Sequence, residues 1–337
     1  MAGRCEILLG MVYLITGIAG FIGSSLAHTL LERGETVRGI DNFSTGRREN
    51  LADIAGRIDV RELDLSQPSD ALHDACRGVD YILHQAALPS VPRSVKDPES
   101  SNRANVNGTL NLLIAAKTAY EQDRRLKRIV YAGSSSAYGD TPTLPKSEEM
   151  LPNPISPYAV AKLAGELYMQ SFYRCYGLET VTLRYFNVFG PRQDPTSQYS
   201  GVMSKFITAM LRGEQPTIYG DGAQSRDFTF IENVVSANLL ACQAPAEKVA
   251  GKVFNIACGD RVDLNQTFAA LKKIIGYKGE AAYDAPRAGD IKHSLADISR
   301  AKQALGFKVL VGFEEGLRRT VEWYREQVSS QQLAVSR

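Results

Sequence analysis

The stretch VYLITGIAGFIG at residues 12–23 joins a short apolar run to three glycines at the start of a helical pattern. Val12–Thr16 predicts a buried β-strand, and the pattern from Ile22 to Glu32, followed by Gly34, predicts a helix that ends at that glycine. Glycines at 17, 20 and 23 permit a tight bend, a close approach of a pyrophosphate to the backbone, and close packing of helix on strand. Amide groups at the helix N-terminus would bind the phosphates.

The chain beyond this turn alternates strand and helix patterns, as a parallel sheet built from βαβ units requires. Further buried strands are expected at Val37–Ile40, Ile58–Leu63, Tyr81–His84, Ile129–Ala132 and Val181–Tyr185. Helices are expected around Ala71 and at Asn105–Tyr120, Tyr158–Tyr176, Val202–Arg212, Glu232–Ala241, Leu264–Ile275 and Glu314–Glu326. We therefore predict an α/β fold: a Rossmann-type doubly wound parallel sheet over residues 11–186, interleaved with a smaller C-terminal α/β substrate-binding lobe over residues 187–330.

Composition excludes several classes of protein. The 337 residues are 44% apolar and 23% charged, with a net charge of +2, which is typical of a soluble globular chain and gives no reason to expect a nucleic-acid partner. Five scattered cysteines without a CxxC pair indicate a reducing compartment, and four histidines add no ligand-like spacing, so we expect no metal. No apolar run approaches ~20 residues, so no membrane span is expected and the protein should be cytoplasmic. Residues 1–10 precede the first strand directly and are suspected to be a leader from an upstream start codon.

An acidic residue, Asp41, follows the second expected strand, 18 residues beyond Gly23. A carboxylate there accepts hydrogen bonds from adenosine ribose hydroxyls and repels a 2′-phosphate, which favours NAD over NADP. Asp41 could instead be an ordinary turn residue, and Arg47 and Arg48 keep NADP open. Asp64 and Leu65, at the end of the third strand, are placed to touch adenine.

Three polar residues form a candidate catalytic set. Tyr158 and Lys162 lie four residues apart and therefore on one face of the helix that Ser156 and Pro157 begin. A lysine ammonium one turn away favours the phenolate, so the pair can take a proton from an alcohol. Ser134 follows a buried strand and can hydrogen bond the same alcohol oxygen. Each feature alone also fits a solvated helix face or a polar turn.

Eight motifs in order extend this picture from Val12 to Tyr324: TGIAGFIG at 16–23, Asp41-Asn42, HQAA at 84–87, SSSAYG at 134–139, YAVAK at 158–162, RYFNVFGPRQ at 184–193, SRDF at 225–228 and RAGD at 287–290. Together they resemble the extended short-chain dehydrogenase/reductase superfamily and, more narrowly, its UDP-sugar 4-epimerases. The resemblance implies that Tyr158 takes the proton of the sugar 4-hydroxyl while C4 gives hydride to NAD. Ser134 would steady the hydroxyl, and Lys162 would hold Tyr158 and the nicotinamide ribose.

The resemblance also implies binding residues. For NAD these are Gly17, Gly20, Phe21, Ile22, Gly23, Asp41, Asn42, Ser44, Thr45, Gly46, Asp64, Leu65, Gln85, Ala86, Ala87, Asn105, Tyr158, Lys162, Tyr185 and Val188. For a UDP-sugar they are Ser134, Ser135, Ser136, Asn187, Val202, Tyr219, Arg226, Arg287, Asp290 and Ser294, with Asn187 and the two arginines on the diphosphate and Tyr219 against uracil. The helices at Asn105–Tyr120 and Tyr158–Tyr176 are those with which relatives form homodimers.

Two positions distinguish the branches of this family. Related dehydratases carry an Asp-Glu pair just after the equivalent of Ser134, and related decarboxylases carry a Glu at the equivalent of 136, whereas this chain has Ser135 and Ser136. Ser294 stands where epimerases restricted to UDP-glucose tend to have tyrosine, and SSSAYG and the RQDP at 192–195 also resemble the branch that prefers N-acetylated sugars. We therefore expect interconversion of UDP-GlcNAc and UDP-GalNAc, supplying GalNAc for surface polysaccharide.

Other functions stay open at this point. UDP-glucose and UDP-glucuronate are alternative substrates, since no residue excludes a carboxylate at C6. A NAD(P)-linked carbonyl reductase would use the same Tyr158 and Lys162 but not Arg226 and Arg287. A cofactor-binding scaffold without catalysis would not need the serine, the tyrosine and the lysine together.

Overall fold

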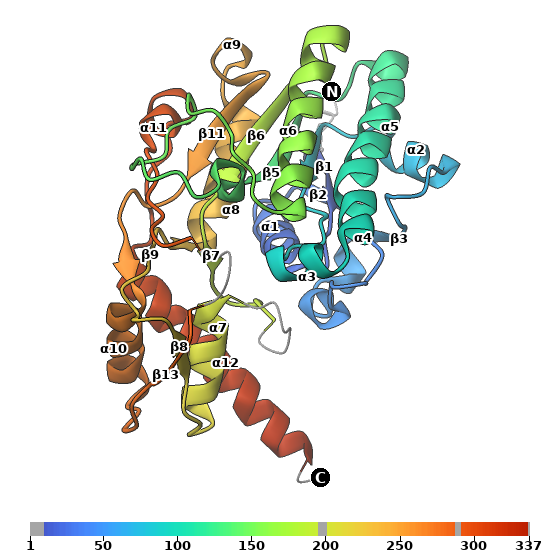
Figure 1. The fold of residues 1–337 in the computed structure, drawn as a ribbon. Helices are drawn as coiled ribbons and strands as arrows, with labels where there is room; N and C mark the ends of the chain where they lie inside the picture. The colour runs from blue at the N-terminus through green and yellow to red at the C-terminus, as the bar shows by residue number, and fades with distance from the viewer. Residues whose placement is uncertain (1–9, 195–200, 287–290, 336–337) are drawn as a thin grey trace, which may run out of the picture.

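A computed structural model describes residues 10–194, 201–286 and 291–335, with side chains to residue 327. Its central sheet has seven strands, all parallel, in the order β11-β6-β5-β4-β1-β2-β3 (Figure 1). Their bounds are β1 (Val12–Thr16), β2 (Thr36–Asp41), β3 (Asp59–Glu62), β4 (Tyr81–His84), β5 (Arg128–Ser134), β6 (Thr180–Tyr185) and β11 (Lys252–Ile256). The predicted doubly wound parallel sheet is confirmed.

Helices cover both faces of this sheet, because successive strand residues point to opposite sides. On one face, Tyr13 and Ile15 of β1 join a buried apolar cluster that includes α1 (Phe21–Glu32) and α8 (Ile231–Gln243). On the other face, Leu14 joins a second cluster with α2 (Asp70–Cys76), α5 (Gly108–Asp123) and α6 (Pro157–Tyr176). Burial on both sides explains why β1 reads as an unbroken apolar run.

Between β4 and α5 the structure has helices that the sequence did not predict. α3 (Val91–Lys96) and α4 (Pro98–Asn102) each begin with a proline in the first turn, and a π-helical turn, η3 (Arg103–Asn107), leads into α5. Proline favours a first helical turn as well as a loop, which explains the omission. Short 3₁₀ turns η1 (Arg48–Leu51), η2 (Ala55–Arg57) and η4 (Ser135–Tyr138) follow β2 and β5.

The second lobe consists of short paired strands and amphipathic helices. Its strand pairs are β7 (Val188–Phe189) with β10 (Thr229–Phe230), β8 (Thr217–Tyr219) with β13 (Ala282–Asp284), and β9 (Ser225–Arg226) with β12 (Val262–Asp263). Its helices are α7 (Val202–Leu211), α9 (Ala246–Val249), α10 (Leu264–Ile275), α11 (Ser299–Leu305) and α12 (Phe313–Val335). Figure 1 shows α7, α10 and α12 gathered below the central sheet.

The two lobes are not separated by one point in the chain. β11 belongs to the part of the sequence beyond residue 187, yet it pairs with β6 at the edge of the main sheet. The predicted boundary between a cofactor-binding lobe (11–186) and a substrate-binding lobe (187–330) therefore stays a prediction about which residues bind which ligand. Among the described residues, no helix has both the length and the apolar character to cross a membrane. Apart from Gly10, the suspected leader lies outside the described residues.

Candidate active site

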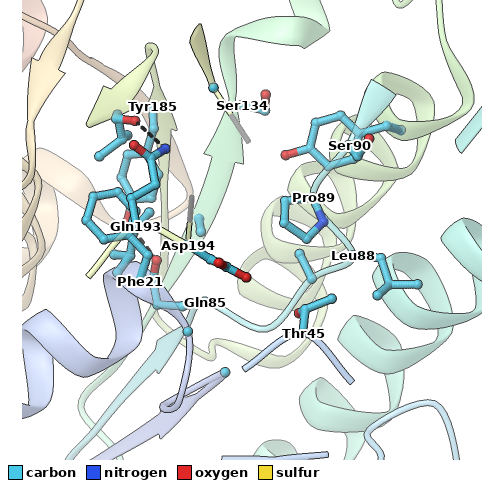
Figure 2. Close-up of a pocket in the computed structure, with 18 of the residues that line it drawn as sticks. Phe21, Thr45, Gln85, Leu88, Pro89, Ser90, Ser134, Tyr185, Gln193 and Asp194 are labelled. Atoms are coloured by element: carbon cyan, nitrogen blue, oxygen red, sulfur yellow. Dashed lines mark hydrogen bonds between the residues drawn. The ribbon is translucent and has the colours of Figure 1, made fainter. Parts of the chain in front are cut away.

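A cavity of about 1260 Å³ lies between the carboxyl ends of the central strands and the second lobe. β1 and β4 are neighbours in the sheet, while the chain runs from β1 to β2 and β3 on one side and returns to β4 on the other. This switch in direction opens a crevice at the carboxyl ends of the strands, where open α/β sheets bind ligands. Figure 2 shows Ser134, Gln85, Tyr185 and Asp194 around this cavity.

The glycine turn lies where β1 meets α1. Gly17 has a φ of +69°, and a Cβ there would approach the backbone of Ala86 to 2.8 Å. A Cβ on Gly23 would collide with the Gly17 carbonyl. The turn therefore requires glycine at both positions, which leaves its backbone and the first turn of α1 open to the cavity. Such a turn fits a dinucleotide pyrophosphate.

Asp41 at the end of β2 is bonded to the glycine turn. Its carboxylate accepts hydrogen bonds from the amides of Ala19 at 2.9 Å and Phe43 at 2.8 Å. Burial raises the pKa of Asp41, and these backbone bonds oppose that rise. A Cβ on Gly46 would lie 2.8 Å from both carboxylate oxygens, so the loop packs tightly over them. Each oxygen has a lone pair left for a ribose hydroxyl, so the residues present fit NAD.

The arginines that kept NADP open each face an acid. Arg48 pairs with Glu62 at 2.6 Å and lies 3.8 Å above the Phe43 ring. Arg47 pairs with Asp194 at 3.2 Å. Both guanidinium groups are therefore engaged by carboxylates, and the geometry favours NAD over NADP.

Ser134, Tyr158 and Lys162 meet at the end of β5. Ser156 caps α6 by accepting a hydrogen bond from the Ala159 amide at 3.2 Å, and the Tyr158 amide donates to the Ser94 hydroxyl at 3.0 Å. These bonds fix the first turn of α6. Ser134, Tyr158 and Lys162 all line the cavity, so the structure brings the predicted trio to one site.

Burial controls the protonation of this trio. It raises the pKa of Tyr158, while the hydrogen bond to Ser134 lowers it. Burial lowers the pKa of Lys162 to about 7. The Lys162 ammonium donates to the Ala132 carbonyl at 2.9 Å and lies 4.9 Å from the centre of the Tyr131 ring. A buried lysine whose pKa is lowered toward neutral pH is typical of a functional site.

His84, the first residue of the HQAA motif, has a structural place beneath the cavity. Its ring lies 2.7 Å from the Thr16 hydroxyl and 2.9 Å from the Thr109 hydroxyl. Burial lowers its pKa to about 3, so the imidazole is neutral at physiological pH. It joins the end of β1 to α5, and the next three residues of the motif, Gln85 to Ala87, line the cavity.

All but one of the described residues predicted to bind NAD line the cavity. The exception is Asn105, which is buried in the π-helical turn and hydrogen bonds to the Leu88 backbone, at 2.8 Å from its amide and 3.3 Å from its carbonyl. It fixes the loop that forms the cavity wall, so any effect of Asn105 on NAD passes through Leu88. A π-helical turn often marks a functional site.

The second lobe supplies the opposite wall with the predicted substrate residues Asn187, Val202, Tyr219, Arg226 and Ser294. The Ser294 amide donates to the Ser225 carbonyl at 3.0 Å, and the Arg226 guanidinium donates to the same carbonyl at 3.0 Å. Arg226 and Ser294 are thus held next to each other. Arg287 and Asp290 lie outside the described residues.

Asp227 is a residue whose importance the sequence did not reveal. It is fully buried and accepts hydrogen bonds from the amides of Cys258 at 2.9 Å, Gly259 at 3.1 Å and Ala296 at 3.2 Å. Burial raises its pKa to about 7, against these backbone bonds. Asp227 therefore ties together three segments, two of which carry Arg226 and Ser294. Its place in the SRDF motif at 225–228 was the one sequence feature that could have identified it.

Two further lining segments were also not predicted. One is the Leu88–Arg93 segment after β4, which includes the first turn of α3, and the other is the Arg192–Asp194 segment after β7. Both follow the carboxyl end of a parallel strand, which is the signal that could have identified them. Figure 2 shows Leu88, Pro89 and Ser90 facing Gln193 and Asp194 across the cavity.

Comparison with known proteins gives consistent matches. Residues 13–257 match the model of the NAD dependent epimerase/dehydratase family. A UDP-glucose 4-epimerase of Mycolicibacterium smegmatis is 37% identical over 93% of this chain and 98% of its own length. A UDP-glucuronate 4-epimerase of Thermodesulfobacterium geofontis is 31% identical over 94% and 97%. The solved UDP-N-acetylglucosamine 4-epimerase of Methanobrevibacter ruminantium, in complex with UDP-N-acetylmuramic acid, is 40% identical, with a TM-score of 0.88 over 95% of this chain and 100% of that one.

Proposed function

The chain belongs to the NAD dependent epimerase/dehydratase family, and from this premise we propose that it inverts C4 of a UDP-sugar. The observation that carries the proposal is the hydroxyl cluster at the end of β5. Tyr158 and Ser134 both line the cavity, Ser134 lowers the pKa of the Tyr158 phenol, and the Ser134 hydroxyl lies 2.8 Å from that of Ser136. A general base and a hydroxyl partner are present, while positions 135 and 136 carry no carboxylate to expel water or to assist loss of CO₂. A ketone formed here would be reduced again.

Tyr158, Ser134 and Lys162 have separate roles in the proposed reaction. Tyr158, as phenolate, takes the proton of the sugar 4-hydroxyl, and Ser134 hydrogen bonds to that oxygen. Lys162, when charged, stabilises the phenolate. NAD, when bound, accepts the hydride from C4 and returns it to the opposite face of the 4-keto sugar. Tyr158 then gives its proton back, so the epimer is formed without net oxidation.

The second lobe is proposed to hold the UDP part. Arg226, Asn187 and Tyr219 all line the cavity. A guanidinium suits phosphate oxygens, and an aromatic ring suits uracil packing. Arg287 and Asp290 are retained as proposed contacts from the sequence. Firm binding of the diphosphate leaves the sugar free to turn between the two hydride transfers.

For the sugar we propose UDP-GlcNAc and UDP-GalNAc. Ser294 lines the cavity and has a small side chain. The hydrogen bond from its backbone amide to the Ser225 carbonyl fixes the backbone there. A small residue at this position leaves room for a 2-acetamido group. UDP-glucose and UDP-glucuronate are the alternatives, and relatives of each kind are similar to this chain.

The test is to incubate the purified protein with UDP-GlcNAc, UDP-glucose and UDP-glucuronate separately, without added reductant, and to resolve C4 epimers by NMR. We expect epimers from UDP-GlcNAc and slower conversion of UDP-glucose. No epimer from any of the three would refute the proposal. Stoichiometric consumption of NADPH with a simple ketone would indicate a carbonyl reductase, and absence of cofactor reduction by any UDP-sugar would indicate a scaffold.

A homodimer is proposed from the face that α5 and α6 share. Ile114 of α5 is 44% exposed, and Val160 and Leu167 of α6 are 53% and 55% exposed. Figure 1 shows α5 and α6 side by side on the outside of the sheet. A second copy would cover these apolar side chains. Light scattering should give twice the mass of the chain, and a monomer mass would refute it.

A further inference from the structure

A segment with no role in the proposed chemistry crosses to the nucleotide end of the cavity. It comprises Gly190–Asp194 and is here called the strap. Gly190 has a φ of 152°, which glycine adopts without strain, whereas Arg192 has a φ of 69°, which a side chain rarely adopts. The conformation of Arg192 persists only where surrounding contacts hold it.

The strap is attached to the second lobe at Gln193. The Gln193 carbonyl accepts a hydrogen bond from the phenol of Tyr324 in α12 at 2.6 Å, and Tyr324 is 2% exposed. The Gln193 side chain donates to the Val188 carbonyl at 3.4 Å. The base of the strap is therefore fixed by a buried residue that itself lies away from the cavity.

The strap reaches the first lobe through Asp194. A carboxylate oxygen of Asp194 lies 3.2 Å from a guanidinium nitrogen of Arg47. The Arg47 amide donates to the Ala19 carbonyl at 2.9 Å, and the Ala19 amide donates to Asp41. Arg47 is therefore attached to the residue that joins the glycine turn to the ribose-binding carboxylate. Figure 2 shows the Asp194 side chain within the cavity, opposite Thr45.

Longer-range charge interactions act in the same sense. Arg192 is half-buried in the strap, and burial lowers its pKa. The charges of Asp53 and Glu32, two acids of the first lobe, oppose that shift. The strap therefore presents both charges to the first lobe: Asp194 pairs with Arg47, and Arg192 interacts with acidic residues.

We propose that the Arg47–Asp194 ion pair is a clasp that retains NAD. A cofactor that is regenerated in each cycle has no need to leave, and the pair joins the two lobes at the part of the cavity where the pyrophosphate and the ribose would lie. Pairing also neutralises Asp194, whose carboxylate would otherwise repel the pyrophosphate. The clasp acts on the cofactor and is independent of which sugar is the substrate.

The test is the rate at which NAD leaves the loaded protein. Wild type, Asp194→Asn and Glu62→Gln are loaded with NAD, passed through a desalting column and diluted, and retained NAD is measured over time by mass spectrometry. Glu62 pairs with Arg48, the residue after Arg47, and this pair does not span the cavity. Glu62→Gln is therefore the matched control. The clasp pair is partly exposed, at 44% and 29% for its side chains, so Asp194→Asn should release NAD about two- to fivefold faster. The control should match wild type.

Two more measurements separate a clasp from a general loosening of the loop. Arg47→Gln should release NAD faster than Asp194→Asn, because it removes the positive charge while Asp194 keeps its negative charge. The double variant should be no faster than Arg47→Gln alone, since both changes break one interaction. Added salt should accelerate release from wild type and have little effect on Asp194→Asn. Unchanged or slower release from Asp194→Asn, or additive losses in the double variant, would overturn the proposal; failure of wild type to bind NAD would instead count against the assigned cofactor.

Discussion

The nucleotide end of the first lobe and the substrate wall of the second lobe are built in different ways. Gly17, Asp41 and Ser134 lie in or directly beside parallel strands of the main sheet, so the sheet itself sets their positions. Arg226 and Ser294 lie on short pairings that the buried carboxylate of Asp227 joins to the rest of the lobe. Changes at the first site should therefore affect the chemical step, whereas changes at the second should affect the choice and binding of substrate.

The largest effect is expected at the first site, from Tyr158→Phe. Removing the phenol oxygen removes the general base, and epimerisation should fall by about 10²–10⁴-fold. The glycine turn and Asp41 are untouched, so NAD should stay bound. NMR of the epimers gives the rate, and mass spectrometry of the desalted protein gives the NAD content. Full activity in this variant would remove Tyr158 from the mechanism.

The corresponding change in the second lobe is Ser294→Tyr, which should alter substrate choice. A tyrosine would fill the space proposed for the 2-acetamido group, and exclusion of one such group is worth about 10–200-fold in specificity. Turnover of UDP-GlcNAc should therefore fall by about 10–200-fold, while UDP-glucose is spared. The ratio of kcat/KM for the two substrates measures this. Equal loss on both would contradict a steric role.

The two lobes should also respond to pH in opposite directions. Lys162 has a folded pKa of about 7, below its ordinary value of 10.5, so the unfolded chain binds more protons between these values and stability rises with pH from about 7 to 10. Asp227 has a folded pKa of about 7, above its ordinary 3.8, so the folded chain binds more protons and stability falls as pH rises from about 4 to 7. Each slope is at most about 1.4 kcal/mol per pH unit.

Urea unfolding across pH checks both slopes. Lys162→Met should flatten the pH dependence of the unfolding free energy above pH 7 and leave it unchanged below pH 7. Asp227→Asn should flatten it below pH 7 and leave it unchanged above pH 7. If both variants kept the wild-type profile, neither buried group would titrate as its surroundings imply. A single variant that flattened both ranges would mean that the lobes are coupled more closely than their contacts indicate.

The smallest effects are expected at helix caps. Ser156 caps α6 next to Tyr158, and Asp263 caps α10 through a capping box with Gln266. Replacing either cap with alanine should cost about 0.5–2 kcal/mol in unfolding free energy. Ser156→Ala should also lower kcat, because the first turn of α6 carries the base, whereas Asp263→Ala should change stability more than kcat. Thermal unfolding and steady-state kinetics on both variants make this comparison.

The main sheet was predictable because its strands carry their own signals. β1 and β4 have the predicted bounds, and β2, β5 and β6 differ from them by one or two residues at an end. Burial on both faces favours apolar and β-branched residues, so these strands read as mostly apolar or β-branched runs between turns. Gly17 and Asp41 were predictable for a related reason, since a glycine turn and the acid after the next strand belong to one local βαβ unit.

The substrate wall was harder to predict because its contacts are distant in the sequence. Asp227 reaches Cys258, Gly259 and Ala296, and no local pattern reveals which amides a buried carboxylate will accept. β11 was missed for a similar reason: its place depends on pairing with β6 across the whole second lobe. The pair of Arg47 with Asp194 likewise joins loops from different lobes.

The return of β11 to the main sheet limits how this chain can be divided. A fragment ending at residue 186 would lack β11 and would expose the backbone edge of β6, whose six residues are all buried in the whole chain. An open apolar edge pairs readily with other chains, so such a fragment would be prone to aggregate. The nucleotide-binding half therefore cannot serve as an independent module for fusion or exchange, and any shorter version must keep residues 252–256.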